Sequence, residues 1–339
     1  MHRSEITIDL GAIRHNARRL LELLDGAELW AVVKANGYGH GAADVARAAL
    51  SAGATALCVA TVDEGLELRE REPEARILIM GPPSEPREVA AARNARLELV
   101  VSGGEIPGDI PVHLKLDTGM GRWGLSELPT PTANVVGLMS HLATSDSDPA
   151  FARQQIARFR EATEPYSHLT RHLANSAAAL RLPEARFDAA RSGIALLGIS
   201  PFETDPAEDG LRPALSWRSR LAQVRLLRPG ESTGYGRRFV AGRPTWIGIV
   251  PVGYEDGFRR DMCGTEILVD GERRRTIGTV SMDAVAVELD RELPVGTPVT
   301  VIGDGVLVEQ HAKVADTIGY EIACGINAGA VRARRIVHD

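Results

Sequence analysis

The chain has 339 residues, of which 39 are Lys or Arg, 45 are Asp or Glu and 44% are hydrophobic. This length predicts one large or two linked domains, and the composition is typical of a globular protein with a sizeable core. The formal net charge of −6 argues against a broadly basic nucleic-acid surface. No apolar run reaches the roughly 18 residues of a membrane span, and the N-terminal segment lacks a signal peptide's apolar stretch. We therefore expect a soluble, cytoplasmic protein. The spacing of its three cysteines fits neither a disulfide framework nor a metal-ligand motif.

The first half of the chain alternates helical and strand-like patterns. Apolar residues at helical spacing predict a helix over residues 10–25, with Asp9 in a capping position. Five strand-like runs, ending at Val33, Ala60, Met80, Val101 and Leu116, are then predicted as strands, and three weaker ones lie near residues 135–140, 168–173 and 187–190. Helical stretches over residues 42–51, 62–70 and 148–163 lie between several of them. This order favours a parallel (β/α)8 TIM barrel, although an open doubly wound sheet predicts nearly the same string.

The second half changes character after about residue 213. Strand-like stretches begin near residues 215, 245, 265 and 298, and Pro-Gly, Asp-Gly and Gly-Asp turn signals join several of them. One helical pattern follows, near residues 306–319. We therefore predict a barrel domain over residues 1–213 and a mainly β domain over residues 214–339.

The stretch AVVKANGYGHGA, residues 31–42, carries the most chemical information. Lys34 directly follows a short β-branched strand and precedes a glycine-rich loop. Barrel enzymes place their reactive groups at the carboxyl-terminal ends of the strands. Partial burial there favours the neutral amine, a nucleophile that can form a Schiff base. The alternative interpretation is a surface lysine after an edge strand.

Polar residues recur at the same end of the later predicted strands. They are Lys115 and Arg122 after the fifth, His141 after the sixth, His172 and Ser176 after the seventh, and Arg191, Gly193 and Ile194 at the end of the eighth. Loops after the seventh and eighth strands of barrels often bind phosphate. Each residue alone also fits a structural ion pair, a core histidine or a turn. Their shared position predicts an enzyme that holds a phosphorylated ligand beside a Schiff-base lysine.

Taken in order, the motifs resemble those of the alanine racemase family. The resemblance covers nearly the whole chain, from IDLGAIRHN through VVKANGYGHG, LKLDTGMGRWG, HLANSAA, ARSGIALLG and RPGESTGYG to VPVGYEDG and GTVSMDAV. It implies an N-terminal barrel, a C-terminal β domain and pyridoxal 5'-phosphate (PLP) as the cofactor. It also implies a homodimer with shared active sites that racemises alanine and supplies D-alanine for peptidoglycan in a bacterial cytoplasm.

The resemblance implies two bases on opposite faces of the substrate. Lys34 would hold the cofactor and act on the D-isomer, and Tyr235 of the second subunit would act on the L-isomer. One base removes the Cα proton and the other returns a proton to the far side, which explains racemisation. A phenol is a weak base near neutrality, and the resemblance implies that His172, hydrogen-bonded between Tyr235 and Arg191, assists it.

Arg191 resembles the family's partner of the cofactor's pyridine nitrogen. Because arginine does not readily give up its proton, the ring nitrogen stays unprotonated and is a weaker electron sink, which disfavours transamination. The resemblance also implies that the phosphate is bound by Tyr38, Ser176, Gly193 and Ile194, and that His141 lies close to the cofactor ring. Arg122 and the Met282 amide would bind the substrate carboxylate, and Lys115, which is carbamylated in some members, would orient Arg122. Tyr254 and Asp283 correspond to residues that form or support the entrance.

The chain departs from the family pattern at a few positions. The ending CGINAGAVRARRI lacks the common Arg-Val-Pro-Arg-like sequence, and Ala328 falls near the position of a phosphate-binding tyrosine. Leu197 stands where tyrosine is frequent, and Ser281 where cysteine also occurs. These changes bear on cofactor affinity rather than on the reaction class.

Three other functions fit parts of the pattern. A racemase of broader specificity, for larger amino acids, depends on the width of the entrance at Tyr254. A PLP-dependent amino-acid decarboxylase of the same fold group would pair the ring nitrogen with a carboxylate and use a cysteine, and Arg191 and Tyr235 argue against it. A non-catalytic PLP carrier, built as a lone barrel, would have no use for the β domain.

Overall fold

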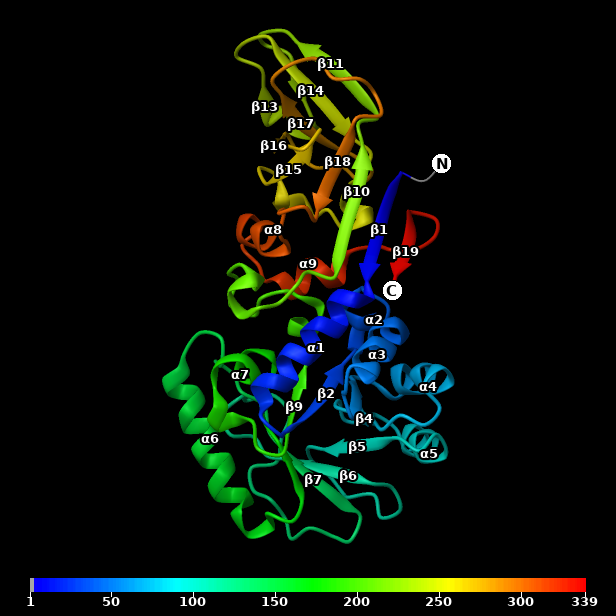
Figure 1. Cartoon of the computed structure of the whole chain (residues 1–339), viewed down its shortest axis with the longest axis vertical. Coiled ribbons are helices and arrows are strands. Elements are labelled where there is room, and N and C mark those ends of the chain that lie inside the picture. The colour runs from blue at the N-terminus through cyan, green and yellow to red at the C-terminus, as the bar shows by residue number, and fades with distance from the viewer. Residues whose placement is uncertain (1–2) are drawn as a thin grey trace. The chain divides into compact units, whose positions relative to one another are not determined.

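The computed structural model describes residues 3–339. The chain forms two compact units, shown in Figure 1. The barrel unit comprises residues 13–202 and 209–212, and the β unit comprises the N-terminal segment to residue 12 together with residues 203–208 and 213–339.

The barrel unit contains a closed ring of eight parallel strands, β2 to β9. All eight predicted strands are confirmed, and the parallel pairing of β2 with β9 distinguishes a barrel from an open sheet. The strands are β2 (Glu28–Val32), β3 (Ala56–Val59), β4 (Ile77–Ile79), β5 (Glu98–Val101), β6 (Val112–Lys115), β7 (Val135–Met139), β8 (Thr170–His172) and β9 (Ala189–Ser192).

Helices occupy most of the crossovers between the barrel strands (Figure 1). The predicted first helix is confirmed, and the Asp9 carboxylate accepts a hydrogen bond from the Ala12 amide at 2.9 Å, which caps its first turn. The helices are α1 (Leu10–Leu24), α2 (Lys34–Tyr38), α3 (Ala42–Ser51), α4 (Val62–Arg71), α5 (Pro86–Asn94), α6 (Pro149–Thr163) and α7 (Ser176–Arg181), with 3₁₀ turns η1 (Glu164–Tyr166), η2 (Pro183–Ala185) and η3 (Ile194–Leu197). A further 3₁₀ turn, η4 (Pro206–Asp209), includes residues assigned to both units.

The β unit is built on a nine-stranded sheet in the order β11-β14-β17-β16-β15-β18-β10-β1-β19. Its strands are β1 (Ser4–Asp9), β10 (Leu215–Arg220), β11 (Gln223–Leu227), β14 (Thr245–Val250), β15 (Glu266–Val269), β16 (Glu272–Ile277), β17 (Val285–Leu289), β18 (Pro298–Ile302) and β19 (Ala333–His338). A separate ribbon is formed by β12 (Ser232–Thr233) and β13 (Phe239–Val240). The mainly β fold predicted for this half is therefore confirmed.

Local sequence signals explain the turns of this sheet, but they do not show that β1 belongs to it. The Asp-Gly signal forms the β15–β16 hairpin, where Asp270 and Gly271 both have positive φ, as a two-residue type I′ turn requires. Strand β1 pairs antiparallel with β10 and parallel with β19, so the N-terminal segment completes the sheet of the β unit. The predicted domain boundary between residues 213 and 214 did not include the N-terminal segment in the β domain, and this boundary stays a prediction.

The helices of the β unit are short. The predicted helical pattern is confirmed as α8 (Val308–Val314), and a second helix that the sequence analysis did not predict, α9 (Gly319–Gly325), follows it. Its glycine at each end weakens the local helix signal, and packing against α8 stabilises it instead. Three 3₁₀ turns complete the unit: η5 (Tyr235–Arg237), η6 (Tyr254–Asp256) and η7 (Arg260–Met262).

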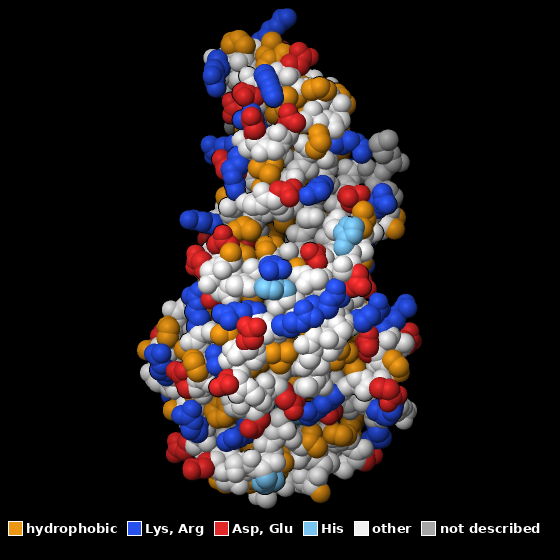
Figure 2. All heavy atoms as spheres, viewed as in Figure 1, with side chains coloured by type: hydrophobic (Ala, Val, Ile, Leu, Met, Phe, Trp, Pro, Cys, Tyr) orange, Lys and Arg blue, Asp and Glu red, His pale blue; other side chains and the backbone are white. Residues whose placement is uncertain are grey.

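Across residues 3–339, no helix is both long and apolar enough to cross a membrane. On the face drawn in Figure 2, Lys and Arg side chains are interspersed with Asp and Glu side chains. This mixture agrees with the small negative net charge of the chain.

Candidate active site

Lys34 begins α2, one residue after the end of β2, and is half-buried. The next three residues have left-handed backbone angles, with φ and ψ of 51° and 49° at Ala35, 51° and 46° at Asn36, and 62° and 39° at Gly37. Tyr38 also has a positive φ, of 52°. A left-handed conformation costs a non-glycine residue about 1–2 kcal/mol. The chain therefore stores strain directly after Lys34, as functional sites commonly do.

Hydrogen bonds from neighbouring elements hold this strained turn. The Ala35 amide donates to Glu64 Oε1 of α4 at 2.7 Å, and the Ala42 amide donates to Asn36 Oδ1 at 3.0 Å. The other Glu64 oxygen accepts from the Ala60 amide at 2.7 Å. Glu64 thus ties the Lys34 turn to the end of the adjacent strand. Glu64 was not among the predicted site residues, although Thr61 and Glu64 carry the spacing of a capping box, which the structure contains.

Three of the four predicted phosphate contacts follow β8 and β9, and the fourth, Tyr38, lies against them from α2. Ser176 Oγ accepts from the Gly193 amide at 3.1 Å and from the Ala195 amide at 3.4 Å. Gly193 lies against Tyr38, since a Cβ atom added at Gly193 would come within 2.4 Å of the Tyr38 hydroxyl oxygen. Ile194 begins the adjoining turn η3. A buried hydroxyl, backbone amides and a phenol therefore surround one small region at the carboxyl-terminal end of the barrel.

Arg191, on β9, is a buried cation of the barrel interior. Its Nη1 donates to His172 Nδ1 at 2.8 Å and to the His172 carbonyl at 2.7 Å, and its Nη2 donates to the Ser140 carbonyl at 2.8 Å. Burial lowers the pKa of Arg191 to about 10, so the guanidinium keeps its proton at neutral pH. The side chain is therefore fixed, charged and buried, as a partner of a ring nitrogen would need to be.

The predicted hydrogen bond between His172 and Tyr235 of the second subunit stays a prediction, and the contacts of His172 inside the barrel argue against it. His172 is fully buried, and while its Nδ1 accepts from Arg191 its Nε2 contacts His113 Nδ1 at 2.8 Å. Both ring nitrogens are thus occupied inside the barrel, and a neutral imidazole has no third site for a phenol. His141 also contacts Arg191, with 3.4 Å between His141 Nδ1 and Arg191 Nη2. Burial and the Arg191 charge lower the pKa of His141 to about 3, which keeps this imidazole neutral.

Lys115 and Arg122 lie on and after β6, beside the indole of Trp123. The Lys115 ammonium is 5.7 Å from the Trp123 ring centroid, and the Arg122 guanidinium is 5.3 Å from it. Burial, together with the positive charges of Arg122 and Arg191, lowers the pKa of Lys115 to about 8. A lysine whose amine is partly neutral near pH 7 can react with carbon dioxide, so its environment is compatible with a carbamate.

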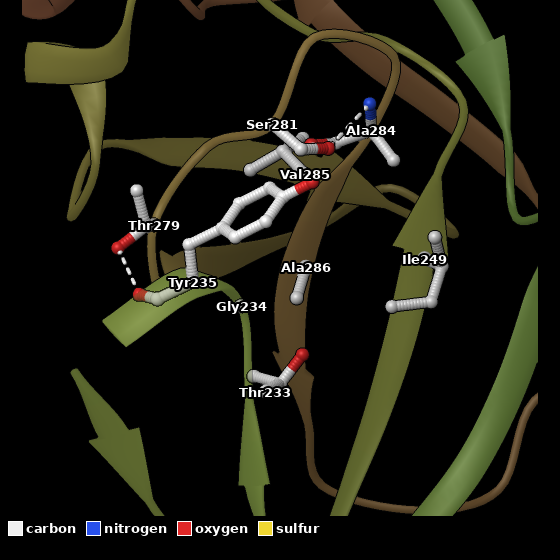
Figure 3. A pocket seen from close by; sticks show the side chains of 9 residues that line it. All are labelled: Thr233, Gly234, Tyr235, Ile249, Thr279, Ser281, Ala284, Val285 and Ala286. Carbon is white, nitrogen blue, oxygen red and sulfur yellow. Dashed lines mark hydrogen bonds between the residues drawn. The ribbon is translucent and has the colours of Figure 1, made fainter. Parts of the chain in front are cut away.

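In the β unit, Tyr235 lines a pocket of about 360 Å³. Its carbonyl accepts a hydrogen bond from Thr279 Oγ1 at 2.7 Å (Figure 3), and the residue is 72% exposed. The other residues of the pocket are Thr233, Gly234, Ile249, Thr279, Ser281, Ala284, Val285 and Ala286. Ile249 and Ala286 also pack in the hydrophobic cluster of this unit, so a rigid core supports the pocket.

The other predicted residues of the β unit lie on two joined loops. The Tyr254 amide donates to the Ser281 carbonyl at 3.1 Å, which connects the GYEDG and SMD motifs. Tyr254 and Met282 are 40% and 50% exposed, an unusual degree for large apolar side chains. Asp283 accepts from Arg3 at 3.0 Å and from Arg332 at 2.9 Å, and these hydrogen bonds hold its pKa below the ordinary range.

Arg332 gives the divergent tail a structural role. It pairs with the buried Asp256 at 2.8 Å as well as with Asp283 at 2.9 Å, and so connects the tail to both loops. Ala328 is half-buried and contributes no side-chain hydrogen-bonding group. Nothing in the structure explains the change at Leu197, which is buried in η3.

The fold and the site define a two-domain barrel enzyme with a lysine and a buried arginine at the carboxyl-terminal ends of its strands. Models of the alanine racemase N-terminal and C-terminal domains match residues 8–201 and 214–336. The chain is 39% identical to alanine racemase 1 of Bacillus subtilis, over 96% of this chain and 91% of that one. It also resembles the biosynthetic alanine racemase of Pseudomonas aeruginosa, with a TM-score of 0.92, 37% identity and complete coverage of both chains.

A third similar structure is an alanine racemase from Bacillus anthracis solved with bound L-Ala-P, with a TM-score of 0.86, 31% identity and coverage of 100% of this chain and 96% of that one. The chain therefore belongs to the alanine racemase family of isomerases. The family and fold predicted from the sequence are confirmed.

Proposed function

We propose that the protein uses PLP to interconvert L-alanine and D-alanine with two bases, Lys34 and Tyr235 of the partner subunit. The fixed turn after Lys34 and the exposed phenol of Tyr235 support these assignments. The bacterial relatives support a role in supplying D-alanine. Location in the cytoplasm and use in peptidoglycan stay predictions from the family resemblance.

The residues at the end of the barrel fit PLP. Ser176, the Gly193 amide and Tyr38 would hold the phosphate, in a space that a side chain at residue 193 would fill. Arg191 would meet the ring nitrogen through Nε, since its hydrogen bonds to the described residues use Nη1 and Nη2. His141 would lie against the ring. When bound, PLP draws electron density away from the substrate Cα and makes its proton acidic.

The side chains of this protein would then bind, orient and transfer protons. The Lys34 Nζ would hold the cofactor and move a proton on one face of Cα, and the Tyr235 hydroxyl would serve the other face. With both nitrogens of His172 engaged, His141 is the histidine we propose to assist the phenol. Its Nδ1 contacts Arg191 Nη2 at 3.4 Å and burial keeps the ring neutral, so its proton would lie on Nε2 and could be donated as a hydrogen bond to the phenolate oxygen.

Charge and exposure support the remaining assignments. Arg122 would bind the substrate carboxylate, and Lys115, alone or as a carbamate, would orient Arg122 beside Trp123. The Met282 amide would help hold the substrate carboxylate across the dimer interface, and the exposed Tyr254 would narrow the entrance, which favours a side chain as small as methyl. Asp283 would support these loops through Arg3 and Arg332. Completion of each site by the second subunit makes the homodimer part of the proposal.

Hydrogen exchange at Cα tests the reaction directly. We expect L-alanine incubated in deuterium oxide with the PLP-loaded protein to yield D-alanine that carries deuterium at Cα, as followed by mass spectrometry with chiral separation. Proton transfer at Cα requires this exchange, whereas decarboxylation releases carbon dioxide. Bound cofactor without exchange of alanine would favour the broader racemase or the decarboxylase, and absence of bound PLP would contradict the proposal.

Gly193→Ala tests the phosphate site. The added methyl group would come within 2.4 Å of the Tyr38 hydroxyl oxygen, so Tyr38 and the phosphate cradle must move. We expect a loss of roughly tenfold or more in PLP affinity, about 1.4 kcal/mol, with an unchanged fold. Fluorescence titration with PLP measures the affinity, and Gly108→Ala, where an added Cβ meets nothing within 4 Å, is the control. Equal affinities of the two variants would contradict the assignment.

A further inference from the structure

A chain of hydrogen bonds crosses the barrel interior behind Arg191. Arg191 Nη1 lies 2.8 Å from His172 Nδ1, His172 Nε2 lies 2.8 Å from His113 Nδ1, and His113 Nε2 lies 2.9 Å from Glu98 Oε2. Arg76 Nε donates to Glu98 Oε1 at 2.8 Å and to Oε2 at 3.0 Å. Branched apolar residues fill most barrel interiors, so a buried polar chain of this length is unusual. We call these residues the Glu98–Arg191 chain.

The chemistry of the two ends fixes the direction of every bond between them. Arg191 can only donate, so His172 Nδ1 accepts and the His172 proton is on Nε2. His172 Nε2 then donates to His113 Nδ1, and His113 Nε2 donates to the carboxylate of Glu98. A carboxylate can only accept hydrogen bonds, so Glu98 ends the chain of donors that begins at Arg191.

The charges in the chain agree with this direction. Burial and the nearby Arg191 hold the pKa of His172 well below its ordinary value, and burial also lowers the pKa of His113. Although burial acts to raise it, hydrogen bonds from His113 and Arg76 leave the pKa of Glu98 below its ordinary value. Two neutral imidazoles therefore separate a buried cation from a carboxylate.

The surrounding residues are shaped to hold the two imidazoles. Trp30 is fully buried, and its ring centroid lies 4.4 Å from that of His172 and 5.7 Å from that of His113. Gly137, opposite His113 on β7, leaves room for the ring, since a Cβ there would come within 2.2 Å of His113 Nδ1. The neighbouring strands thus fit this one arrangement of the histidines.

We propose that Glu98 and His113 are positioning residues that act through His172 to fix the orientation and charge of Arg191. Glu98 begins β5 and is remote in sequence from every residue assigned to substrate or cofactor. Its effect on the ligand rests on the proposed function, because Arg191 would act there on the ring nitrogen. The direction of the hydrogen-bond chain does not rest on it.

The first test follows protons in the protein without added cofactor. Long-range ¹H–¹⁵N spectra of histidine-labelled protein should show His113 and His172 as neutral rings protonated at Nε2, with assignments from His113→Gln and His172→Gln. An Nδ1-protonated or doubly protonated His172 would overturn the proposal. Glu98→Gln has one acceptor oxygen for the donors of Arg76 and His113, so the Nε2–H signal of His113 should shift or broaden.

The second test follows the side reaction of the PLP-loaded protein. In that reaction, alanine leaves its amino group on the cofactor, giving pyridoxamine phosphate and pyruvate. We expect Glu98→Gln to raise the fraction of turnovers that end in transamination about tenfold. At metal sites, mutating a residue that hydrogen-bonds a metal ligand typically changes affinity or activity by about 10- to 100-fold, and we expect an effect at the lower end of that range here. Gly137→Ala, which displaces His113 and leaves every charge in place, should do the same and carries the test if Glu98→Gln does not fold.

Asp188→Asn is the matched control for both tests. Asp188 precedes β9 at the same amino-terminal end of the barrel and pairs with Arg171 at 3.2 Å, outside the Glu98–Arg191 chain. It should change neither the histidine signals nor the product ratio. If Glu98→Gln and Gly137→Ala gave the same product ratio as Asp188→Asn, the Glu98–Arg191 chain would contribute only to packing of the barrel core, and the proposal would be overturned. Failure of the wild-type protein to bind PLP would refute the proposed function and leave the histidine result standing.

Discussion

Lys34→Ala is expected to remove the covalent attachment of the cofactor and with it the visible absorbance of the lysine-bound form. Racemisation of alanine should fall by at least roughly 10³-fold, since the variant loses both the nucleophilic amine and one of the two bases. The fold should persist, because Lys34 is half-buried and the hydrogen bonds of the following turn use backbone amides and the side chains of Glu64 and Asn36. Absorbance and chiral product analysis measure the two effects.

The lysine content of the chain makes this prediction unusually sharp. The sequence holds three lysines, Lys34, Lys115 and Lys313. Borohydride reduction of the PLP-loaded protein should therefore label the peptide that contains Lys34, as read by mass spectrometry. Lys313 is exposed on α8, so Lys313→Arg is the control and should keep both the label and the activity. Label on Lys115 or Lys313 instead would contradict the assignment.

The sequence predicted the barrel well because each strand carries a local signal. Parallel strands buried on both faces form short apolar runs, which most of the eight show, whereas β8 (Thr170–His172) carries a weaker signal. Closure of the ring is not a local property, since it depends on the pairing of β2 with β9 across the whole unit. The same limit applies to β1, whose partners β10 and β19 lie far along the chain.

The candidate site was predictable where its residues follow strands and form motifs. Lys34, Arg191 and Ser176 lie where the barrel rule places functional groups. His113 was missed although it lies two residues before Lys115, on the same face of β6, which was a usable signal. Glu98 carries no local signal, because its role depends on contacts with β6 and with Arg76. For the same reason the sequence could not show that His113 occupies the second nitrogen of His172.

Tyr235→Phe is expected to keep the bound cofactor and its absorbance while racemisation falls roughly 10²- to 10⁴-fold, the usual contribution of a positioned base. The variant loses one hydroxyl from a side chain that is 72% exposed, so stability should change little. Because the phenol is proposed to serve L-alanine, exchange of the Cα hydrogen of L-alanine with deuterium oxide should fall with racemisation. Exchange of D-alanine, through Lys34, should continue. Full activity in both directions would refute the two-base assignment, and Tyr166→Phe is a control for phenol loss outside the site.

Combining the two inactive variants tests whether each site uses two subunits. In a mixed dimer of Lys34→Ala and Tyr235→Phe chains, a shared-site arrangement places both defects in one site and leaves the other intact. Random exchange of subunits should then restore about one quarter of the wild-type activity, because half of the dimers are mixed and each has one intact site. If Lys34 and Tyr235 served the same site from one chain, no mixed dimer would have an intact site and no activity would return. Sedimentation of the mixture confirms that dimers are present, and an active monomer would overturn the shared-site proposal.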